Sequence, residues 1–396
     1  MTTGTDRRRG PVALALGMAA IVAIVVISGC GGSSSSAEGG GEGDLSQTDP
    51  DATFAIPDDV FVQLAELPSG RTIPYFSAEL SGRYAEQNLT VIPMEGDPSI
   101  GDPVLALGDE EGPSILIAPA AAALRASAEI TPLVEVARIA TRSGDRIIVP
   151  ADSGISSVAD LAGRTITVLE GPAGESVRPA LVAAGLDPAA VVIGAAPFDA
   201  AAVAAHQVEA AHVRLEDEWA QVLERIDEET GELVDPASFT VIDLSDPAIA
   251  MPGDGIWVRA DWLPGHEEVV VRFLAAVLGE WAACRDDLEM CAVNAYDNGS
   301  LLPLQHQRWV VTEMGRLVWP ADPVLGSMTP DDWSSMAARA VAAGVVETVP
   351  TVEEGMRTDL LERAIAALEG IDLAGDGYAP APVEITPGGE DPATAP

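Results

Sequence analysis

Lysine is absent from this chain of 396 residues, and all 21 of its basic residues are arginine. A lysine amine is the group that forms a Schiff base with an aldehyde cofactor such as pyridoxal phosphate. Its absence argues against every reaction that begins with that step. Histidine is also scarce, with only four residues, and the three cysteines have no histidine partners at metal-ligand spacing. We therefore expect neither a cofactor nor a metal site.

Positively charged residues are also few in this sequence. The sequence has 62 acidic residues against those 21 arginines, which gives a formal net charge of −41. Residues 1–29 hold one acid and three bases, so the rest of the chain has 61 acids, 18 bases and a net charge of −43. Such a surface repels phosphate backbones and anionic lipid, which argues against nucleic acid as a partner. A well-solvated acidic surface is the simplest interpretation.

The first of the three cysteines, Cys30, follows an arginine cluster and an apolar run from Val12 to Ile27. The sequence ISGC at residues 27–30 is typical of a lipobox, at which bacterial lipoproteins are cleaved and lipidated. An uncleaved membrane helix is less favoured, because the apolar run is at the short edge of the roughly 17–25 residues that a span needs. We expect a signal peptide over 1–29, lipidation of Cys30 and a flexible tether over 30–53. Both interpretations place the body outside the cell membrane, and the lipid would anchor it on the extracytoplasmic face.

Cys284 and Cys291 are seven residues apart near the end of a helical pattern. On one unbroken helix their Cα atoms would be about 10 Å apart, beyond the reach of a disulfide. The sequence Arg285-Asp286-Asp287 is a plausible break, with an aspartate capping the next helix. An exported protein permits oxidation, so we predict a Cys284–Cys291 disulfide that links two helices.

The remaining pattern predicts an α/β fold. The length is sufficient for two substantial cores or one two-lobed body. Residues 114–118 (SILIA) form a buried strand candidate followed by an alanine-rich helix, and residues 146–149 (RIIV) form another strand candidate. Strands that alternate with helices are typical of open α/β sheets. The tail over 375–396 is rich in proline, glycine and acids, and we expect it to be disordered.

Four stretches in sequence order resemble a known family: IPYFSAELSGRYAEQNLTVIPMEG (73–96), DSGISSVADLAGRTITVLEGPAGES (152–176), VEAAHVRLEDEWAQVLE (208–224) and VIDLSDPAIAMPGDGIWVRADWL (241–263). They are similar to the ThiY-like and SsuA-like solute-binding proteins of ABC importers, which are related to the fungal thiamine pyrimidine synthase. The resemblance runs from about residue 58 to about residue 370. Its carboxyl-terminal part is most similar to members associated with flavin or pyrimidine uptake.

The resemblance implies a two-lobed periplasmic-binding-protein fold of type II, in which two crossing strands act as a hinge and the ligand lies in the cleft. Lobe one would comprise residues 54–145 and 245–374, and lobe two would comprise residues 146–244. The crossings would lie near Thr141–Pro150 and Val241–Trp257.

Ligands of open α/β sheets bind outside the carboxyl ends of the strands. That rule, together with the resemblance, predicts seven ligand-binding residues: Tyr75, Pro119, Gly171, Gly174, Glu175, Glu218 and Trp257. The two aromatic rings could stack on a flat heterocycle, and Pro119 begins a helix whose first N–H groups are free. The glycines let the backbone approach a ligand closely.

Glu218 stands where family members commonly have the acid of a Tyr-Asn-Glu run, and its carboxylate could accept hydrogen bonds from a ring amine. Glu216 replaces the tyrosine of that run, which removes one stacking contact. Ordinary roles compete with these assignments. Tyr75 could be a core anchor, Glu216 and Asp217 could be solvated acids at a helix start, and Trp309 and Trp319 could belong to the core or to the cleft wall.

The leading hypothesis is a lipoprotein, not an enzyme, that captures a small heteroaromatic nutrient and delivers it to an ABC transporter permease. A thiamine-pyrimidine precursor or a riboflavin-like molecule is the first choice of ligand, and a sulfonate or another small anion is the alternative. A monomer is expected. Two further classes remain open: a single-turnover pyrimidine synthase, disfavoured because lysine is absent, and a ligand-free sensory or interaction module on the cell surface.

Overall fold

The computed structural model describes residues 56–393, so the predicted signal peptide, Cys30 and the tether lie outside the described residues. The strands are β1 Asp58–Leu64, β2 Leu89–Met94, β3 Ile115–Pro119, β4 Leu133–Arg138, β5 Asp145–Pro150, β6 Thr165–Leu169, β7 Val192–Ala196, β8 Ala210–Arg214, β9 Phe239–Asp243 and β10 Asp254–Arg259. The α-helices are α1 Ile73–Leu80, α2 Arg83–Glu86, α3 Ala120–Glu129, α4 Val177–Ala183, α5 Ala200–Ala204, α6 Glu218–Leu223, α7 Glu267–Asp286, α8 Leu288–Asp297, α9 Leu304–Val318, α10 Pro330–Ala342, α11 Val352–Gly355 and α12 Thr358–Ala366. In this part of the chain, no helix is both long enough and apolar enough to cross a membrane.

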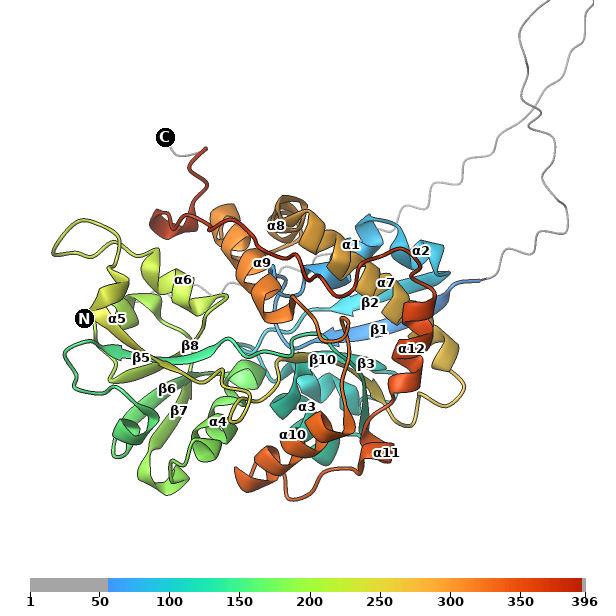
Figure 1. Ribbon diagram of the computed structural model, residues 1–396, viewed down its shortest axis with the longest axis horizontal. Coiled ribbons are helices and arrows are strands. Elements are labelled where there is room, and N and C mark those ends of the chain that lie inside the picture. Colours follow the sequence, from blue (N-terminus) through green and yellow to red (C-terminus); the bar gives the residue numbers. More distant parts are fainter. Residues whose placement is uncertain (1–55, 394–396) are drawn as a thin grey trace, which may run out of the picture. The chain divides into compact units, whose positions relative to one another are not determined.

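The first sheet has the strand order β2-β1-β3-β10-β4. β1 is parallel to β2 and β3, whereas β10 runs antiparallel to β3 and β4. Its central strands are buried on both faces, which is why β3 is a continuous apolar run. Helices α3 and α10 cover one face, and α1, α2, α7 and α12 cover the other (Figure 1).

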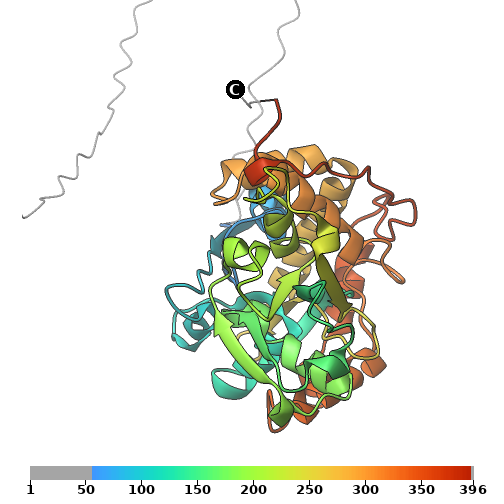
Figure 2. The same ribbon diagram turned by 90° about the vertical axis from the view of Figure 1, so that its left-hand side faces the viewer.

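The second sheet has the order β7-β6-β8-β5-β9, with β5 antiparallel to both of its neighbours. Helix α4 packs against one face, where Val177 and Leu181 belong to the same buried cluster as Ile147 and Ile166. Helices α5 and α6 pack against the other face. Figure 2 turns this half of the described chain toward the viewer. The two sheets with helices on both faces form the two-lobed periplasmic-binding-protein fold that the sequence predicts.

Two chain segments connect the sheets, one from β4 to β5 and the other from β9 to β10. They run beside each other: the amide of Gly253 donates to the carbonyl of Ala140 at 3.1 Å, and the amide of Leu244 donates to the carbonyl of Asp145 at 3.3 Å. A connection of only two adjacent segments is the usual geometry of a hinge.

The carboxyl-terminal helices are joined by a disulfide between Cys284 and Cys291, whose Cα atoms are 5.5 Å apart. Helix α7 ends at Asp286, and the Asp287 side chain then accepts a hydrogen bond from the Met290 amide and caps α8. The break between the helices brings the cysteines within bonding distance. The disulfide and the helix break are those that the sequence predicts together.

Residues 375–393, for which composition predicts disorder, have defined contacts with α9. The Tyr378 hydroxyl donates to the carbonyl of Thr312 at 3.0 Å. The Gln305 side-chain amide donates to the carbonyl of Glu384 at 2.8 Å, and Ile385 packs against the same buried cluster as Trp309. This part of the tail therefore packs against the body of the protein.

Candidate functional site

A cavity of about 340 Å³ lies between the two sheets. From the first sheet its wall takes residues 65–69 after β1, residues 97–99 after β2, and Pro119 at the end of β3. From the second sheet it takes residues after β6, β7 and β8, and residues 300–302 complete it. These strands all present their carboxyl ends to the cavity, which is the usual ligand position in open α/β sheets.

Most of the cavity wall is apolar and rigid. Five prolines contribute to it, together with leucines and one aromatic ring, Phe198. Proline has a fixed φ and little side-chain entropy to lose, so such a wall is largely formed before a ligand arrives. Small-molecule pockets of about 300–1,000 Å³ commonly combine an apolar wall of this kind with a few polar groups.

The polar wall is centred on Arg214, the last residue of β8. The next helix, α6, begins at Glu218, so the turn between them brings the Glu218 carboxylate back onto the guanidinium. Glu218 accepts hydrogen bonds from Nε and Nη2 of Arg214 at 3.0 and 2.8 Å, and from the Arg214 amide at 3.0 Å. Both side chains are buried, which makes this two-bond ion pair strong and geometrically fixed.

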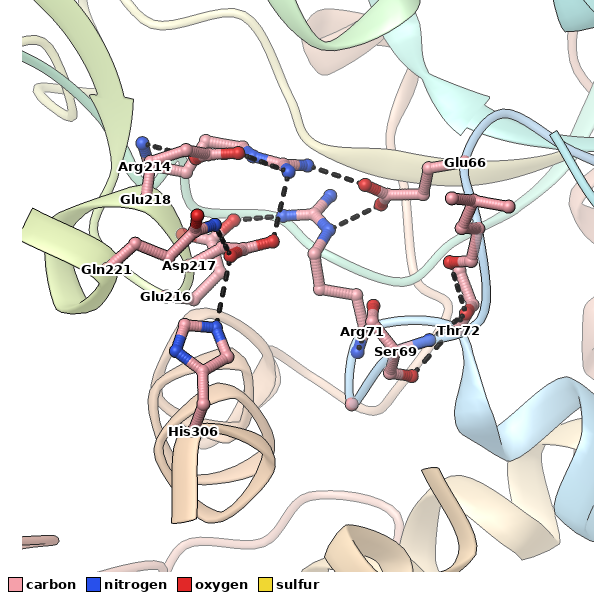
Figure 3. A network of polar contacts seen from close by, with 12 residues as sticks. Glu66, Ser69, Arg71, Thr72, Arg214, Glu216, Asp217, Glu218, Gln221 and His306 are labelled. Atoms are coloured by element: carbon pink, nitrogen blue, oxygen red, sulfur yellow. Dashed lines mark hydrogen bonds and ion pairs between the residues drawn. The ribbon is translucent and has the colours of Figure 1, made fainter. Parts of the chain in front are cut away.

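Glu66, the second residue after β1, connects this arginine to another one (Figure 3). Its carboxylate accepts from Arg214 at 2.8 Å and from Arg71 at 2.6 Å. Burial alone would raise the pKa of Glu66, but attraction to both arginines holds that pKa below its usual value. Because Glu66 follows β1 and Arg214 ends β8, this ionised carboxylate ties the two sheets together across the cavity.

Arg71 has two further carboxylate partners. One is Asp254 at the start of β10, at 2.8 Å, and the other is Glu216 from the second sheet. Glu216 is almost fully buried, and one of its carboxylate oxygens has no hydrogen-bond partner. Burial raises the pKa of Glu216 to about 7, although Arg71 and Arg214 oppose the shift. Burial likewise raises the pKa of Asp254.

His306 of α9 extends this network beyond Asp217 to Glu224. Its Nε2 atom lies 3.2 Å from Asp217, and its Nδ1 atom lies 2.9 Å from Glu224 (the first of these contacts is drawn in Figure 3). Burial would lower the pKa of His306, but the two carboxylates outweigh it and raise that pKa to about 10. The imidazole is therefore a cation at neutral pH, which stabilises both acids.

Of the seven predicted ligand residues, Pro119 and Glu218 line the cavity. Gly171 lies beside it, between the lining residues Glu170 and Pro172. Its φ is +68°, and a Cβ there would come within 2.8 Å of the Pro98 Cβ atom in the opposite lobe. Only glycine allows this approach, so Gly171 brings the two walls together without lining the cavity itself.

Gly174 and Glu175 have other roles in the structure. A Cβ on Gly174 would lie 2.0 Å from the carbonyl oxygen of Leu169, so the turn after β6 itself requires glycine. Glu175 accepts hydrogen bonds from Arg125 of α3 at 2.8–3.1 Å. It thus forms an ion pair between the lobes outside the cavity wall.

The two aromatic candidates lie in the cores of the first lobe. Tyr75 is 1% exposed and meets Trp281 edge to face, with ring centroids 6.4 Å apart. Trp257 is fully buried against Trp333. The Tyr75 ring faces α7 and the Trp257 ring faces α10, so both side chains fill the cores beneath the covering helices. Neither ring reaches the cavity.

Sequence reasoning missed Glu66 and Arg71. Glu66 is the second residue after β1, so the rule about strand ends could have identified it. Arg71 lies in the loop before α1 and gives no such signal, because its partners come from distant parts of the chain. Within residues 56–393, no group of three or more histidine, cysteine, aspartate or glutamate side chains could hold a metal ion.

Two α/β lobes joined by two adjacent segments, with a ligand-sized cavity at the strand ends between them, define the class of periplasmic-binding-protein folds. The family model described as "NMT1/THI5 like" matches residues 70–287, more than half of the chain, and the protein belongs to this family. No curated protein matches the chain.

Solved structures share the fold. One is a putative periplasmic sulfonate-binding protein SsuA of an ABC transporter from Methylobacillus flagellatus KT, with 20% identity, TM-score 0.56, and coverage of 80% of this chain and 96% of that one. Another is the alkanesulfonate-binding protein SsuA from Xanthomonas axonopodis pv. citri bound to MOPS, with 15% identity, TM-score 0.56, and coverage of 77% and 99%. A third is the desulfurization enzyme DSZB, with 14% identity, TM-score 0.50, and coverage of 79% and 100%. At these identities the likeness concerns the fold alone.

Proposed function

We propose that this protein is an extracytoplasmic solute-binding protein that captures a small organic nutrient and delivers it to an ABC permease. The observation that carries the proposal is the cavity of about 340 Å³ at the carboxyl ends of the strands of both sheets. A ligand there would contact both lobes at once, so binding would favour their closure. Family membership and the shared fold support the same function.

The proposed ligand is a compact heteroaromatic compound, such as a thiamine-pyrimidine precursor or a riboflavin-like molecule. The proline-rich wall offers flat apolar surfaces, and Phe198 is available for ring contact. Glu218 remains the proposed hydrogen-bond acceptor for a ring amine. We further propose that the protein acts as a monomer held at the membrane by a lipid on Cys30.

Binding without chemistry is the second part of the proposal. DSZB, an enzyme, shares the fold, and the family description includes THI5-like proteins. The absence of lysine from the sequence removes the Schiff-base step of a pyridoxal phosphate mechanism. Incubation of the full-length protein with pyridoxal phosphate should leave its intact mass unchanged, with every histidine retained. Conversion of a histidine would overturn this part.

The binding function can be tested on the full-length protein in mild detergent. Native mass spectrometry should detect a molecule carried through purification, and a thermal-shift screen of pyrimidines, flavins and sulfonates should find at least one stabilising compound. The Ala173→Phe variant places a ring in the cavity and should abolish that shift. The matched Ala183→Phe variant, on the exposed end of α4, should keep it.

A shift that survives Ala173→Phe would show that the cavity is not the binding site. A protein that carries no molecule and responds to no compound would contradict solute binding and favour a ligand-free interaction module.

A further inference from the structure

The positive charge at the cavity is already neutralised by the protein itself. Among the described residues, Arg214 is the one basic side chain in the cavity wall. Three carboxylates contact its guanidinium: Glu218 at 2.8 Å, Glu66 at 2.8 Å and Asp217 at 3.3 Å. An anionic ligand would have to compete with all three for the same cation.

The other cationic groups near the cavity are equally occupied. Arg71 lies behind the wall and is paired with Glu66, Glu216 and Asp254. From the N-terminal turn of α3, only Pro119 lines the cavity, and proline has no N–H to donate. The amide of the next residue, Ala120, already donates to the carbonyl of Pro252. At the cavity wall, this helix end therefore offers no free N–H group to an anion.

Negative charge remains at the cavity without compensation. Glu170 follows β6 in the second lobe, and Asp97 lies in the loop after β2 in the first lobe; both line the cavity. Asp97 accepts hydrogen bonds from the amide and hydroxyl of Ser99. Neither acid has an arginine or histidine partner within residues 56–393.

The chain neighbours of these two acids approach each other from opposite lobes. Gly171, next to Glu170, lies so close to Pro98, next to Asp97, that a Cβ on the glycine would be 2.8 Å from the proline Cβ. Two carboxylates thus line a mostly apolar cavity on neighbouring stretches of the two lobes. Like charges brought together in this way favour a cation between them.

We propose that the ligand of this cavity is a cation: a compact apolar or heteroaromatic body that carries a protonated amine, an amidinium or a quaternary nitrogen. Glu170 and Asp97 would hold the positive group, and the prolines, leucines and Phe198 would hold the body. The same electrostatics would discriminate against sulfonates and other small anions. This inference rests on the proposed solute-binding function and names the class of solute.

The test uses two probes with the same body and opposite permanent charge, benzyltrimethylammonium and phenylmethanesulfonate, with benzyl alcohol as the neutral reference. Isothermal titration of the full-length protein at low ionic strength should give an affinity for the ammonium at least tenfold higher than for the sulfonate. The affinity for the ammonium should fall as salt is added, because the attraction is electrostatic.

Variants of the two acids test whether Glu170 and Asp97 cause the preference for the ammonium probe. Glu170→Gln and Asp97→Asn should each weaken ammonium binding several-fold without a loss of thermal stability, and the double variant should bring it close to benzyl alcohol. Glu110→Gln, an exposed acid outside the cavity, is the matched control and should bind as the wild type does.

The outcomes separate the two claims. Equal or tighter binding of the sulfonate would overturn the cation assignment and leave solute binding intact. Ammonium binding that is unaffected in both cavity variants would overturn the assigned residues. Failure of all three probes, together with a failed screen of pyrimidines, flavins and sulfonates, would overturn both the solute-binding function and this inference.

Discussion

Single side chains determine the electrostatic balance between the lobes. Glu66 forms ion pairs with two arginines, and Arg214 forms ion pairs with three carboxylates. Each charge in such a network is tolerated in the interior only because its partners are present. Substitutions here should therefore cost more than the loss of one hydrogen bond.

Replacement of Arg214 by leucine should be strongly destabilising. It leaves Glu218 and Asp217 buried without that cation, and removal of one partner from a buried ion pair typically costs about 3–5 kcal/mol. Urea unfolding at pH 7 measures the change in unfolding free energy. The control is Arg164→Leu, which breaks an exposed pair with Glu209 and should cost about 0–1 kcal/mol. Equal losses in the two variants would contradict the buried network.

Glu216→Gln should change how stability depends on pH. The folded-state pKa of about 7 lies above the ordinary value of 4.5, so the contribution of Glu216 to stability is full below pH 4.5 and is lost as the pH rises through 7. Glutamine does not titrate. The unfolding free energy of the variant relative to the wild type should thus rise between pH 5 and pH 8, by on the order of 3 kcal/mol at most. A difference that stays constant with pH would refute the assignment.

Sequence reasoning identified cavity residues where a local rule applied. Pro119 ends a strand and Glu218 follows one, and the strand-end rule places both in the cavity wall. The same rule predicts Tyr75 at the cavity, because it lies at a junction where a helix begins. The structure buries its ring in the core instead, since helix packing uses the same aromatic side chains as ligand stacking. Arg71 gave no signal because its role depends on partners that only the tertiary fold supplies.

The junction between α7 and α8 shows how short sequence signals define an element. Asp287 ends one helix and caps the next, and the change of direction brings Cys284 and Cys291 together. The spacing of the cysteines, incompatible with one helix, predicted that break. The tail was harder to predict, because its composition is that of a disordered segment and its contacts depend on the surface of α9.

Loss of the disulfide should destabilise the protein modestly. The closed loop is short, and chain-entropy arguments give about 2–3 kcal/mol for a loop of this length. The Cys284→Ser/Cys291→Ser double variant should show this loss in urea unfolding relative to the oxidised wild type. The wild type in the presence of a reductant should match the variant. No difference between oxidised and reduced protein would mean that the bond does not constrain the fold.

At the scale of the whole described body, ion pairs hold the lobes together beyond the hinge. Arg125 of α3 contacts Glu175 of the second lobe and Asp102 of the first at 2.8 and 2.7 Å. Glu66–Arg214 and Arg71–Glu216 bridge the same division. These contacts favour a closed arrangement even before ligand contacts are added.

Arg125→Ala should shift the ligand-free protein toward an open state. Small-angle X-ray scattering should then report a larger radius of gyration. Ligand affinity should fall roughly two- to tenfold, because a smaller fraction of the protein is ready to bind. Arg259→Ala is the control, since its partner Asp261 is two residues away in the same lobe. An unchanged radius together with unchanged affinity would show that the ion pairs of Arg125 do not hold the lobes closed.

The overall architecture was the most predictable level. The alternation of strands and helices, and the four stretches that resemble a known family, indicated two α/β lobes. That pattern is set by local periodicity and survives large changes in sequence. The proposed charge of the ligand was less accessible from the sequence, because it depends on which acids remain unpaired after folding.

Helix α9 has a consequence for the range of motion. His306 on this helix binds Asp217 and Glu224, and the Trp309 indole donates to the carbonyl of Leu215 at 3.0 Å, so α9 is fastened to the lobe on the far side of the hinge. Wide separation of the lobes would require these buried contacts to break. The entrance to the cavity should therefore open by a narrow angle, wide enough for a compact solute and too small for a polymer or a folded partner.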